Sequence, residues 1–183
     1  AEIAQAKADG DSVGGVVECV IDGLPAGIGE PMFGGLENLI ARAVFAIPAI
    51  KGVEFGLGFQ AAARPGSQVH DPIVLADGEF RRTSNNAGGL EGGMTTGEPL
   101  VMACAMKPIP TMMQPLDTVD TDALMPVKAS KERSDVCAVP AAAVVAEAEI
   151  AFVLADAYLE KFGADVIDDV IAACDAYRER IAL

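Results

Sequence analysis

The alternation of apolar and polar positions along the chain predicts three β-strands. In the clearest of them, apolar side chains recur at every second position from Val53 to Phe59, which is the period of a strand with one buried face. Two further apolar runs are bounded by turn signals, the first by Asp22-Gly23 and the second by a pair of prolines. The predicted strands cover residues 16–21, 51–59 and 100–110.

Apolar residues at helical spacing predict four helices. The first ends at Gly10, and the second carries its apolar residues on one face. The third is almost entirely apolar, with Pro140 near its first turn and Gly163 at its end. The fourth has one apolar face. The predicted helices cover residues 1–10, 36–47, 136–162 and 165–181.

Two segments lack a clear period. Residues 60–99 are rich in glycine and polar side chains, and a loop of this length in a compact domain is usually functional or disordered. A second polar segment runs from the last predicted strand to Glu132. Because short strands alternate with both turns and helices, the sequence predicts an α+β fold. We expect a mostly antiparallel sheet packed with helices, in a single domain of residues 1–183.

Composition and charge narrow the possible functions. A hydrophobic fraction of 51% with 22% charged residues excludes wholesale disorder. The formal net charge of −14 repels nucleic-acid backbones and anionic lipid, and the absence of Trp disfavours a base-stacking surface. No apolar run reaches the roughly 20 residues of a membrane span, and no leader sequence is evident. We therefore expect a cytoplasmic protein that binds neither nucleic acid nor membrane.

Several residue types suggest no special chemistry. The four cysteines are far apart and form no C-x-x-C, so we expect reduced thiols and no metal site. The single histidine, His70, could be a general base but is better explained as a surface loop residue. Glu147 and Glu149 interrupt the apolar helix, where they could pair with a buried cation or line a subunit contact.

Two groups of residues could hold an anion. The glycine-rich residues 85–93 can expose backbone N–H groups, although a tight loop between strands is the simpler explanation. The basic group comprises Lys107, Lys128, Lys131 and Arg133. These cations could form an anion pocket or lie on a solvated surface. Asp135 precedes the long helix, where it could lie near the positive helix end or form a surface ion pair.

Taken together, five segments resemble the second half of chorismate synthase, in order and at fitting intervals. They read GDSVGGVVECVIDGLPAGIGEPMFGGLENLIARA, AIPAIKGVEFGLGF, NNAGGLEGGMTTGEPL, MKPIPT and RSDVCAVPA. The likeness extends over nearly the whole chain and its motifs are specific. It implies half of a pseudo-twofold β-α-β sandwich, because GDSVGG and IDGLPAG also resemble the GESHG and IEGLPAG motifs that open the family's first half.

The resemblance implies a lyase of the shikimate pathway of aromatic amino-acid biosynthesis. Such enzymes eliminate phosphate and a proton from 5-enolpyruvylshikimate 3-phosphate to give chorismate. They use reduced FMN, which is not consumed, and the family is associated with NADP and with homotetramers. Because both the substrate and the flavin are anionic, the resemblance also explains a basic pocket in an acidic chain.

The resemblance also implies a set of site residues. The residues matching the family's FMN positions are Pro48, Ala49, Gly92, Lys107, Pro108, Ile109, Pro110, Thr111 and Arg133. Lys107 and Arg133 suit phosphate charge, whereas Pro48 removes a side-chain hydrogen bond that Asn or Gln provides in some members. Asp135 matches an aspartate near flavin N5 and is the candidate catalytic residue for handling the proton there. We expect Gly92, Lys107, Arg133 and Asp135 to share one niche, within the chain or across subunits.

One departure from the family pattern limits the expected activity. The GESHG-type motif and the two histidines that act as acids in the family's first half are absent from these residues, and Val13 stands where the motif has histidine. We therefore expect the isolated chain to be inactive. The alternatives to a catalytic chain are a non-catalytic module that binds FMN or another anion, and a module that serves only oligomerisation.

Overall fold

The computed structural model describes residues 1–133 and 135–182, so Ser134 of the Arg-Ser-Asp motif lies outside the described residues. The helices are α1 (Glu2–Asp9), α2 (Leu36–Ala46), α3 (Val139–Phe162) and α4 (Ile167–Ile181), with short 3-10 helices η1 (Met32–Gly34), η2 (Gly58–Ala63) and η3 (Gly66–Gln68). The strands are β1 (Gly15–Ile21), β2 (Ile50–Phe55), β3 (Ile73–Ala76), β4 (Glu79–Arg82), β5 (Leu90–Glu91), β6 (Met94–Thr95), β7 (Leu100–Met106), β8 (Asp117–Asp120) and β9 (Met125–Lys128).

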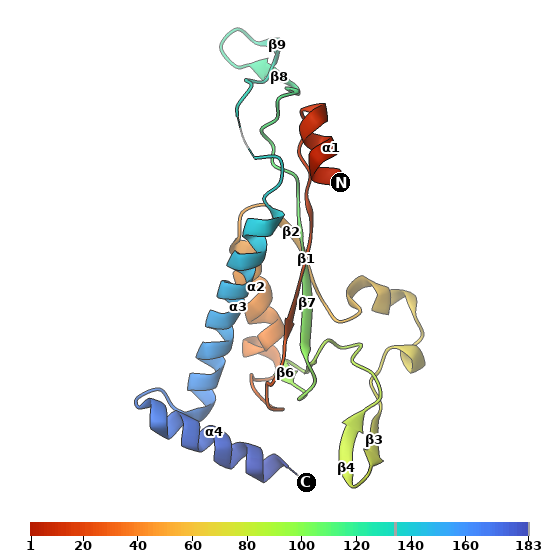
Figure 1. The fold of residues 1–183 in the computed structure, drawn as a ribbon, viewed down its shortest axis with the longest axis vertical. Helices are drawn as coiled ribbons and strands as arrows, with labels where there is room; N and C mark the ends of the chain where they lie inside the picture. Colours follow the sequence, from red (N-terminus) through yellow and green to blue (C-terminus); the bar gives the residue numbers. More distant parts are fainter. Residues whose placement is uncertain (134, 183) are drawn as a thin grey trace.

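The centre of the fold is a three-stranded antiparallel sheet in the order β1-β7-β2 (Figure 1). β1 pairs with β7 in unbroken register over all seven residues. β2 pairs with the other edge of β7, with a shift in register between Ile50 and Gly52. The α+β class and the antiparallel pairing that the sequence predicts are therefore confirmed.

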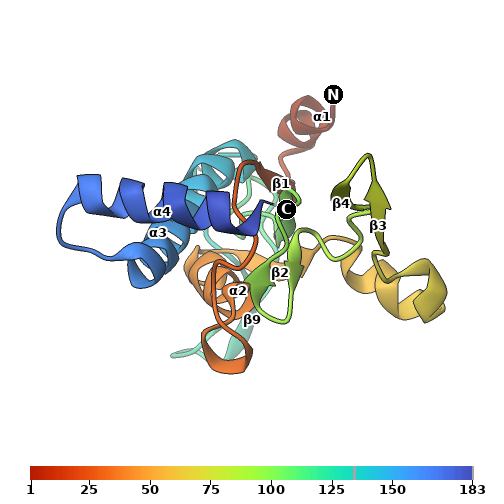
Figure 2. The ribbon, with the colours of Figure 1, turned by 90° about the horizontal axis from the view of Figure 1, so that it is seen from below.

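Helices α2 and α3 cover one face of this sheet, as both views show (Figures 1 and 2). Alternate residues of β7 point into the resulting core, and Met102 is fully buried there. Ile40 of α2 and Ile150 of α3 are buried against it. Among the described residues no α-helix covers the opposite sheet face, and Val16 and Val20 of β1 are more than half exposed on it. Apolar burial is therefore one-sided.

Helix α4 crosses the C-terminal end of α3 and links it to the loop after β1 (Figure 1). The hydroxyl of Tyr177 donates to the carbonyl of Ala26 at 2.8 Å, and its ring meets Phe162 edge-on. At the other end of the molecule, α1 stops at Gly10, which has φ +71° and caps the helix as predicted. Within the described residues, no helix combines the length and apolarity that crossing a membrane requires, α3 included.

Several predicted element bounds are wrong. The strand predicted over residues 51–59 ends at Phe55, because Gly56 turns with positive φ and η2 follows. A Cβ at Gly56 would collide with the backbone of Asn86, so this close approach of two chain segments stops the strand. Helices α3 and α4 begin three and two residues later than predicted, at Val139 and Ile167.

The two segments without a clear period contain ordered hairpins rather than plain loops. In residues 60–99, β3 pairs with β4 and β5 pairs with β6. Asp77 and Gly78 both have positive φ, as a two-residue hairpin turn requires. In the second segment, β8 pairs with β9 in a hairpin that projects beyond α1 (Figure 1).

The one-sided core predicts where truncation is costly. Replacing the fully buried Ile40 by alanine should lower the free energy of unfolding by about 2–5 kcal/mol, because it removes buried methyl groups and leaves a cavity. Phe33, which is 90% exposed, is the matched control and should change stability by less than about 0.5 kcal/mol as Phe33→Ala. Urea unfolding followed by circular dichroism measures both; equal losses would contradict this assignment of the core.

Candidate functional site

Two of the segments predicted to bind a cofactor meet at the end of β7. The chain leaves α2 through Pro48 and enters β2 after Ala49, whose φ of +72° is unusual for a residue with a side chain. This turn directs the Ala49 carbonyl at β7, where it accepts the backbone N–H of Lys107 at 2.9 Å. The structure thus brings Pro48-Ala49 beside the KPIPT segment.

The start of β1 holds the KPIPT segment on its other side. The hydroxyl of Ser12 donates to the carbonyl of Ile109 at 2.5 Å. Gly14 lies against the backbone of Met106 to Pro108, so closely that a Cβ there would collide with the Met106 carbonyl oxygen. Gly14 is therefore needed for this close approach, and the prolines continue away from the sheet in an extended path.

The Arg-Ser-Asp motif joins the same end of the sheet through its next residue. The N–H of Val13 donates to the carbonyl of Val136 at 2.9 Å, which fixes the chain beside Asp135 against the start of β1. Arg133 and Asp135 are both exposed. The end of the sheet that bears Lys107 therefore gathers every predicted site segment except Gly92.

The basic group at this end divides into paired and unpaired cations. Lys128 forms an ion pair with Asp117 across the β8–β9 hairpin at 2.5 Å. Lys107 and Arg133 are exposed, and neither has a carboxylate oxygen within 4.0 Å among the residues that the structure describes. These two cations are free to bind an anion from outside the described chain.

Gly92 lies at the opposite end of the sheet. It occupies the turn between β5 and β6, and the neighbouring Gly93 carbonyl accepts the N–H of Leu36, the first residue of α2. Pro48-Ala49 follows the other end of α2, which has 11 residues and a length of roughly 16 Å. A Cβ at Gly92 would meet nothing within 4 Å. The chain alone therefore does not bring Gly92 into one niche with Lys107.

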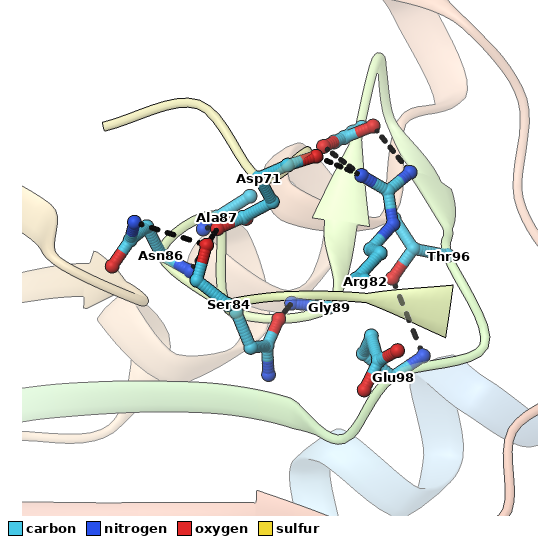
Figure 3. Close-up of polar contacts among 10 residues, drawn as sticks. Asp71, Arg82, Ser84, Asn86, Ala87, Gly89, Thr96 and Glu98 are labelled. Carbon is cyan, nitrogen blue, oxygen red and sulfur yellow. Dashed lines mark hydrogen bonds and ion pairs between the residues drawn. The ribbon is translucent and has the colours of Figure 1, made fainter. Parts of the chain in front are cut away.

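The glycine-rich segment before Gly92 is organised by a buried carboxylate, that of Asp71 (Figure 3). Asp71 Oδ1 accepts the hydroxyl of Ser84 at 2.6 Å and the N–H of Asn86 at 2.7 Å, and Oδ2 accepts the N–H of Ala87 at 2.9 Å. Gly88 then packs on Gly56 so closely that a Cβ at either position would collide. Here the glycines serve a tight loop against the sheet.

A second link connects this loop to the Gly92 turn. Both guanidinium nitrogens of Arg82 bind the Glu91 carboxylate, at 2.9 and 2.8 Å, and Arg82 also donates to the Asp71 carbonyl at 3.0 Å (Figure 3). Asn85 holds the other side, accepting from the N–H of Gly89 at 2.7 Å and donating to the carbonyl of Pro99 at 2.8 Å. The loop is therefore fixed before any ligand binds.

Burial and hydrogen bonding have opposite effects on the pKa of Asp71. Burial raises the pKa of Asp71, but the hydrogen bonds from Ser84, Ala87 and Asn86, together with the Arg82 guanidinium, outweigh burial and hold the pKa below its ordinary value. The carboxylate is thus ionised at neutral pH. Its role was not predicted from the sequence, although an aspartate ahead of a polar, glycine-rich loop is a signal for such backbone capture.

The remaining candidates have structural explanations. His70 is exposed in the loop just after η3. All four cysteines are free, and burial raises the pKa of both Cys19 and Cys104, with Glu147 adding to the effect at Cys19. Among the described residues, no three His, Cys, Asp or Glu side chains are grouped to hold a metal ion.

Comparison with known proteins gives the same family throughout. The family profile described as Chorismate synthase matches residues 1–159. The chorismate synthase of Syntrophotalea carbinolica is 54% identical over 98% of this chain, and that of Bacillus subtilis 52% identical over 93%. A solved structure described as Crystal Structure of Chorismate Synthase superposes with a TM-score of 0.80 at 43% identity, over 98% of this chain.

The chain belongs to the chorismate synthase family. The resemblance read from the sequence motifs is thereby confirmed. The chain spans about half the length of these relatives, covering 47% of the Syntrophotalea carbinolica protein, 44% of the Bacillus subtilis protein and 47% of the solved chain. The profile match ends at residue 159 in α3, so α4 lies beyond it.

The Asp71 network predicts a pH-dependent contribution to stability. Asp71→Asn should lower the free energy of unfolding by about 1–3 kcal/mol at pH 7, because the amide cannot accept all of the carboxylate's hydrogen bonds. The folded-state pKa of Asp71 lies below its unfolded-state value, so this stabilisation is complete above the unfolded-state pKa of about 4 and is lost as pH falls below it.

Urea unfolding at pH 7 and pH 3 would measure this effect, with the exposed Asp175→Asn as the matched control. Amide hydrogen exchange at Asn86 and Ala87 should speed up in the Asp71 variant only. A stability difference that is the same at both pH values would contradict the proposed role of the carboxylate.

Proposed function

We propose that this chain contributes the flavin-phosphate side of the chorismate synthase reaction. In that reaction the C–O bond to phosphate and one C–H bond of 5-enolpyruvylshikimate 3-phosphate break, and a new carbon–carbon double bond forms. Phosphate and a proton leave, so the overall elimination needs neither an oxidant nor a reductant. The reduced FMN, when bound, supplies electron density transiently as phosphate departs.

The observation that carries the proposal is the backbone contact between Ala49 and Lys107. This 2.9 Å hydrogen bond joins two segments that lie 58 positions apart, and both match the family's FMN positions. The unpaired cations of Lys107 and Arg133 supply the charge that a phosphate needs in a chain of net charge −14. The residues present therefore fit an anionic cofactor at this end.

Each site residue has a role consistent with its chemistry. Lys107 would act as a mobile point charge and Arg133 as a planar, two-pronged donor to phosphate oxygens. Pro48 and Ala49 offer backbone rather than side-chain contacts. Pro108 and Pro110 stiffen the segment, which carries Ile109 and ends at Thr111. Asp135 would hold or transfer a proton at the ring position that the family's aspartate faces.

The separation of Gly92 from Lys107 indicates that the proposed cofactor site needs more than one polypeptide. A niche containing both residues needs the Gly92 turn of a second polypeptide, because α2 holds the two apart in one chain. This supports a homo-oligomer, for which the family tetramer is the proposed form, in the cytoplasm. An NADP-linked supply of electrons for the flavin belongs to the same proposal.

A non-catalytic FMN-binding module is the second candidate. These residues contain no GESHG-type motif, and their one histidine, His70, is exposed just after η3, far along the chain from the proposed site. Binding and turnover are therefore separable properties of this chain, and two measurements distinguish the candidates.

The first measurement is a flavin fluorescence titration with FMN. Lys107→Ala and Arg133→Ala should each weaken FMN binding by roughly tenfold, because each removes a charge-assisted hydrogen bond to phosphate. Riboflavin, which lacks the phosphate, should bind the native chain and both variants equally. Arg42→Ala, an exposed cation on α2, serves as control. Unchanged FMN affinity in both variants would refute the phosphate contacts.

The second measurement is a steady-state assay of the chain with reduced FMN and 5-enolpyruvylshikimate 3-phosphate. Turnover should be negligible even at FMN concentrations that saturate binding, because no histidine acid is positioned at the site. Adding a polypeptide that carries the GESHG-type motif should restore activity if the chain is catalytic. Robust turnover by the chain alone would overturn the assignment of the missing acids.

A further inference from the structure

The two prolines of the KPIPT segment interrupt the antiparallel pairing between the chain around β1 and the chain after β7. Pro108 and Pro110 have no backbone N–H, so neither can donate to a neighbouring strand. Among the described residues, no backbone–backbone hydrogen bond involves residues 108–110. Backbone pairing with the chain before β1 resumes at Gln114, whose N–H donates to the carbonyl of Gly10 at 3.0 Å. Residues 108–110 therefore depend on another kind of contact to stay beside the sheet.

The hydroxyl of Ser12 supplies such a contact. It donates at 2.5 Å to the carbonyl of Ile109, the residue between the two prolines, and this distance is at the short end of the range for a hydroxyl donor. The backbone N–H of Ser12 is engaged elsewhere, because it binds Asp11 Oδ1 at 2.7 Å. Ser12 and Ile109 are both half-buried, which strengthens the bond relative to one in open water. The side chain of Ser12 thus takes the place of the interrupted backbone pairing.

The prolines also make the segment stiff, so that one hydrogen bond positions all of it. Each proline fixes its own φ and restricts the residue before it to an extended conformation. The stiff segment is attached at its start, where the N–H of Lys107 donates to the Ala49 carbonyl at 2.9 Å, and in its middle, where Ser12 binds it. Without the second attachment, the segment is free to rotate about the first.

The residue after Ser12 holds the other cation-bearing segment. The N–H of Val13 donates to the carbonyl of Val136 at 2.9 Å, a short distance along the chain from Arg133. Two consecutive residues therefore attach the segments that carry Lys107 and Arg133. Val13 binds through its backbone, which any residue except proline provides, whereas Ser12 binds through its side chain. Of the two attachments, the one at Ser12 is therefore the one that depends on residue type.

We propose that Ser12 is a positioning residue of the anion site, whose hydroxyl holds the KPIPT segment so that Lys107 and Arg133 bind the same anion. This proposal rests on the proposed function, because it takes these two cations as the ligands of the anion. Ser12 acts through Lys107 and removes or adds no charge itself. Its loss should therefore weaken anion binding by misplacing Lys107, since a binding group must be held precisely by the residues that support it.

A carbon-detected NMR spectrum tests the hydrogen bond itself, without any ligand. Labelling isoleucine at the carbonyl carbon and proline at the nitrogen gives signals only from Ile47 and Ile109, the two isoleucines that precede a proline. In Ser12→Ala, the Ile109 carbonyl signal should move because the carbonyl loses its donor, and the Ile47 signal should stay as the internal control. An unmoved Ile109 signal would overturn the contact on which the proposal depends.

A flavin fluorescence titration of the 183-residue chain with FMN tests the consequence for binding. Ser12→Ala should weaken FMN binding by roughly three- to tenfold, because a misplaced Lys107 makes a poorer charge-assisted hydrogen bond. Ser12→Thr keeps the hydroxyl and should bind FMN more tightly than Ser12→Ala. Ser67→Ala, at an exposed serine of η3, is the matched control and should bind like the native chain. Native affinity in Ser12→Ala, or equal weakening in Ser12→Thr, would overturn the proposal.

A double-mutant cycle separates a positioning role from a merely structural one. When Lys107 is already alanine, Ser12→Ala should weaken FMN binding by less than about twofold, because the group that it positions is gone. When Arg133 is alanine and Lys107 is present, Ser12→Ala should keep its full effect. The same fold-change in the native, Lys107→Ala and Arg133→Ala chains would show that Ser12 supports only the fold, and would overturn the proposal.

The same titrations distinguish failure of this proposal from failure of the proposed function. If Lys107→Ala and Arg133→Ala leave FMN affinity unchanged, the proposed function is refuted and the positioning role falls with it. If these two variants weaken FMN binding while Ser12→Ala binds like the native chain, the positioning role alone is overturned. Urea unfolding of each variant ensures that every affinity is measured on folded chains.

Discussion

Everything in this structure depends on β7 being paired on both edges while burying every second side chain. Leu100, Met102, Cys104 and Met106 of β7 face the helices, and all are buried. Antiparallel pairing with β1 and β2 then fixes which ends of the chain segments meet. The Lys107 end of β7 receives Ala49 and the start of β1, and the Leu100 end receives the glycine-rich loop. The positions of the site segments follow from this register.

The elements with a clear hydrophobic period were predictable from the sequence. β1 and α2 lie within one residue of where their patterns place them, whereas β7 begins at the predicted residue but ends at Met106, before the prolines with which the predicted strand of residues 100–110 ended. The β3–β4 hairpin does not follow from the hydrophobic pattern, because residues 60–99 taken as a whole have no clear period. Its Asp77-Gly78 dipeptide, with positive φ at both positions, was a local turn signal that composition over a long window hides.

The sequence motifs name the candidate site residues, whose role stays a prediction, but they do not give the spatial arrangement of those residues. The KPIPT and Pro48-Ala49 segments carry specific motifs, and they do meet. The Asp71 network could not be read from spacing, because its partners depend on a tertiary fold that returns Ser84 and Asn86 to Asp71. The pseudo-twofold sandwich likewise remains an expectation, since in the part of the chain that the structure describes, α2 and α3 cover a single face of the sheet (Figure 2).

The glycines of this chain have two different structural roles. Gly56 and Gly88 are required because each backbone occupies the space where the other's Cβ would stand, so they explain packing and nothing about a ligand. Gly92 also has positive φ, but the position where its Cβ would stand is open. An open glycine turn does not serve packing within its own chain, and the Arg82–Glu91 pair holds it rigid. That combination suits a contact with another molecule. Under the proposed function, Gly92 contacts the cofactor that Lys107 of a second subunit holds. The contact is between subunits because α2 separates Gly92 from Lys107 within one chain.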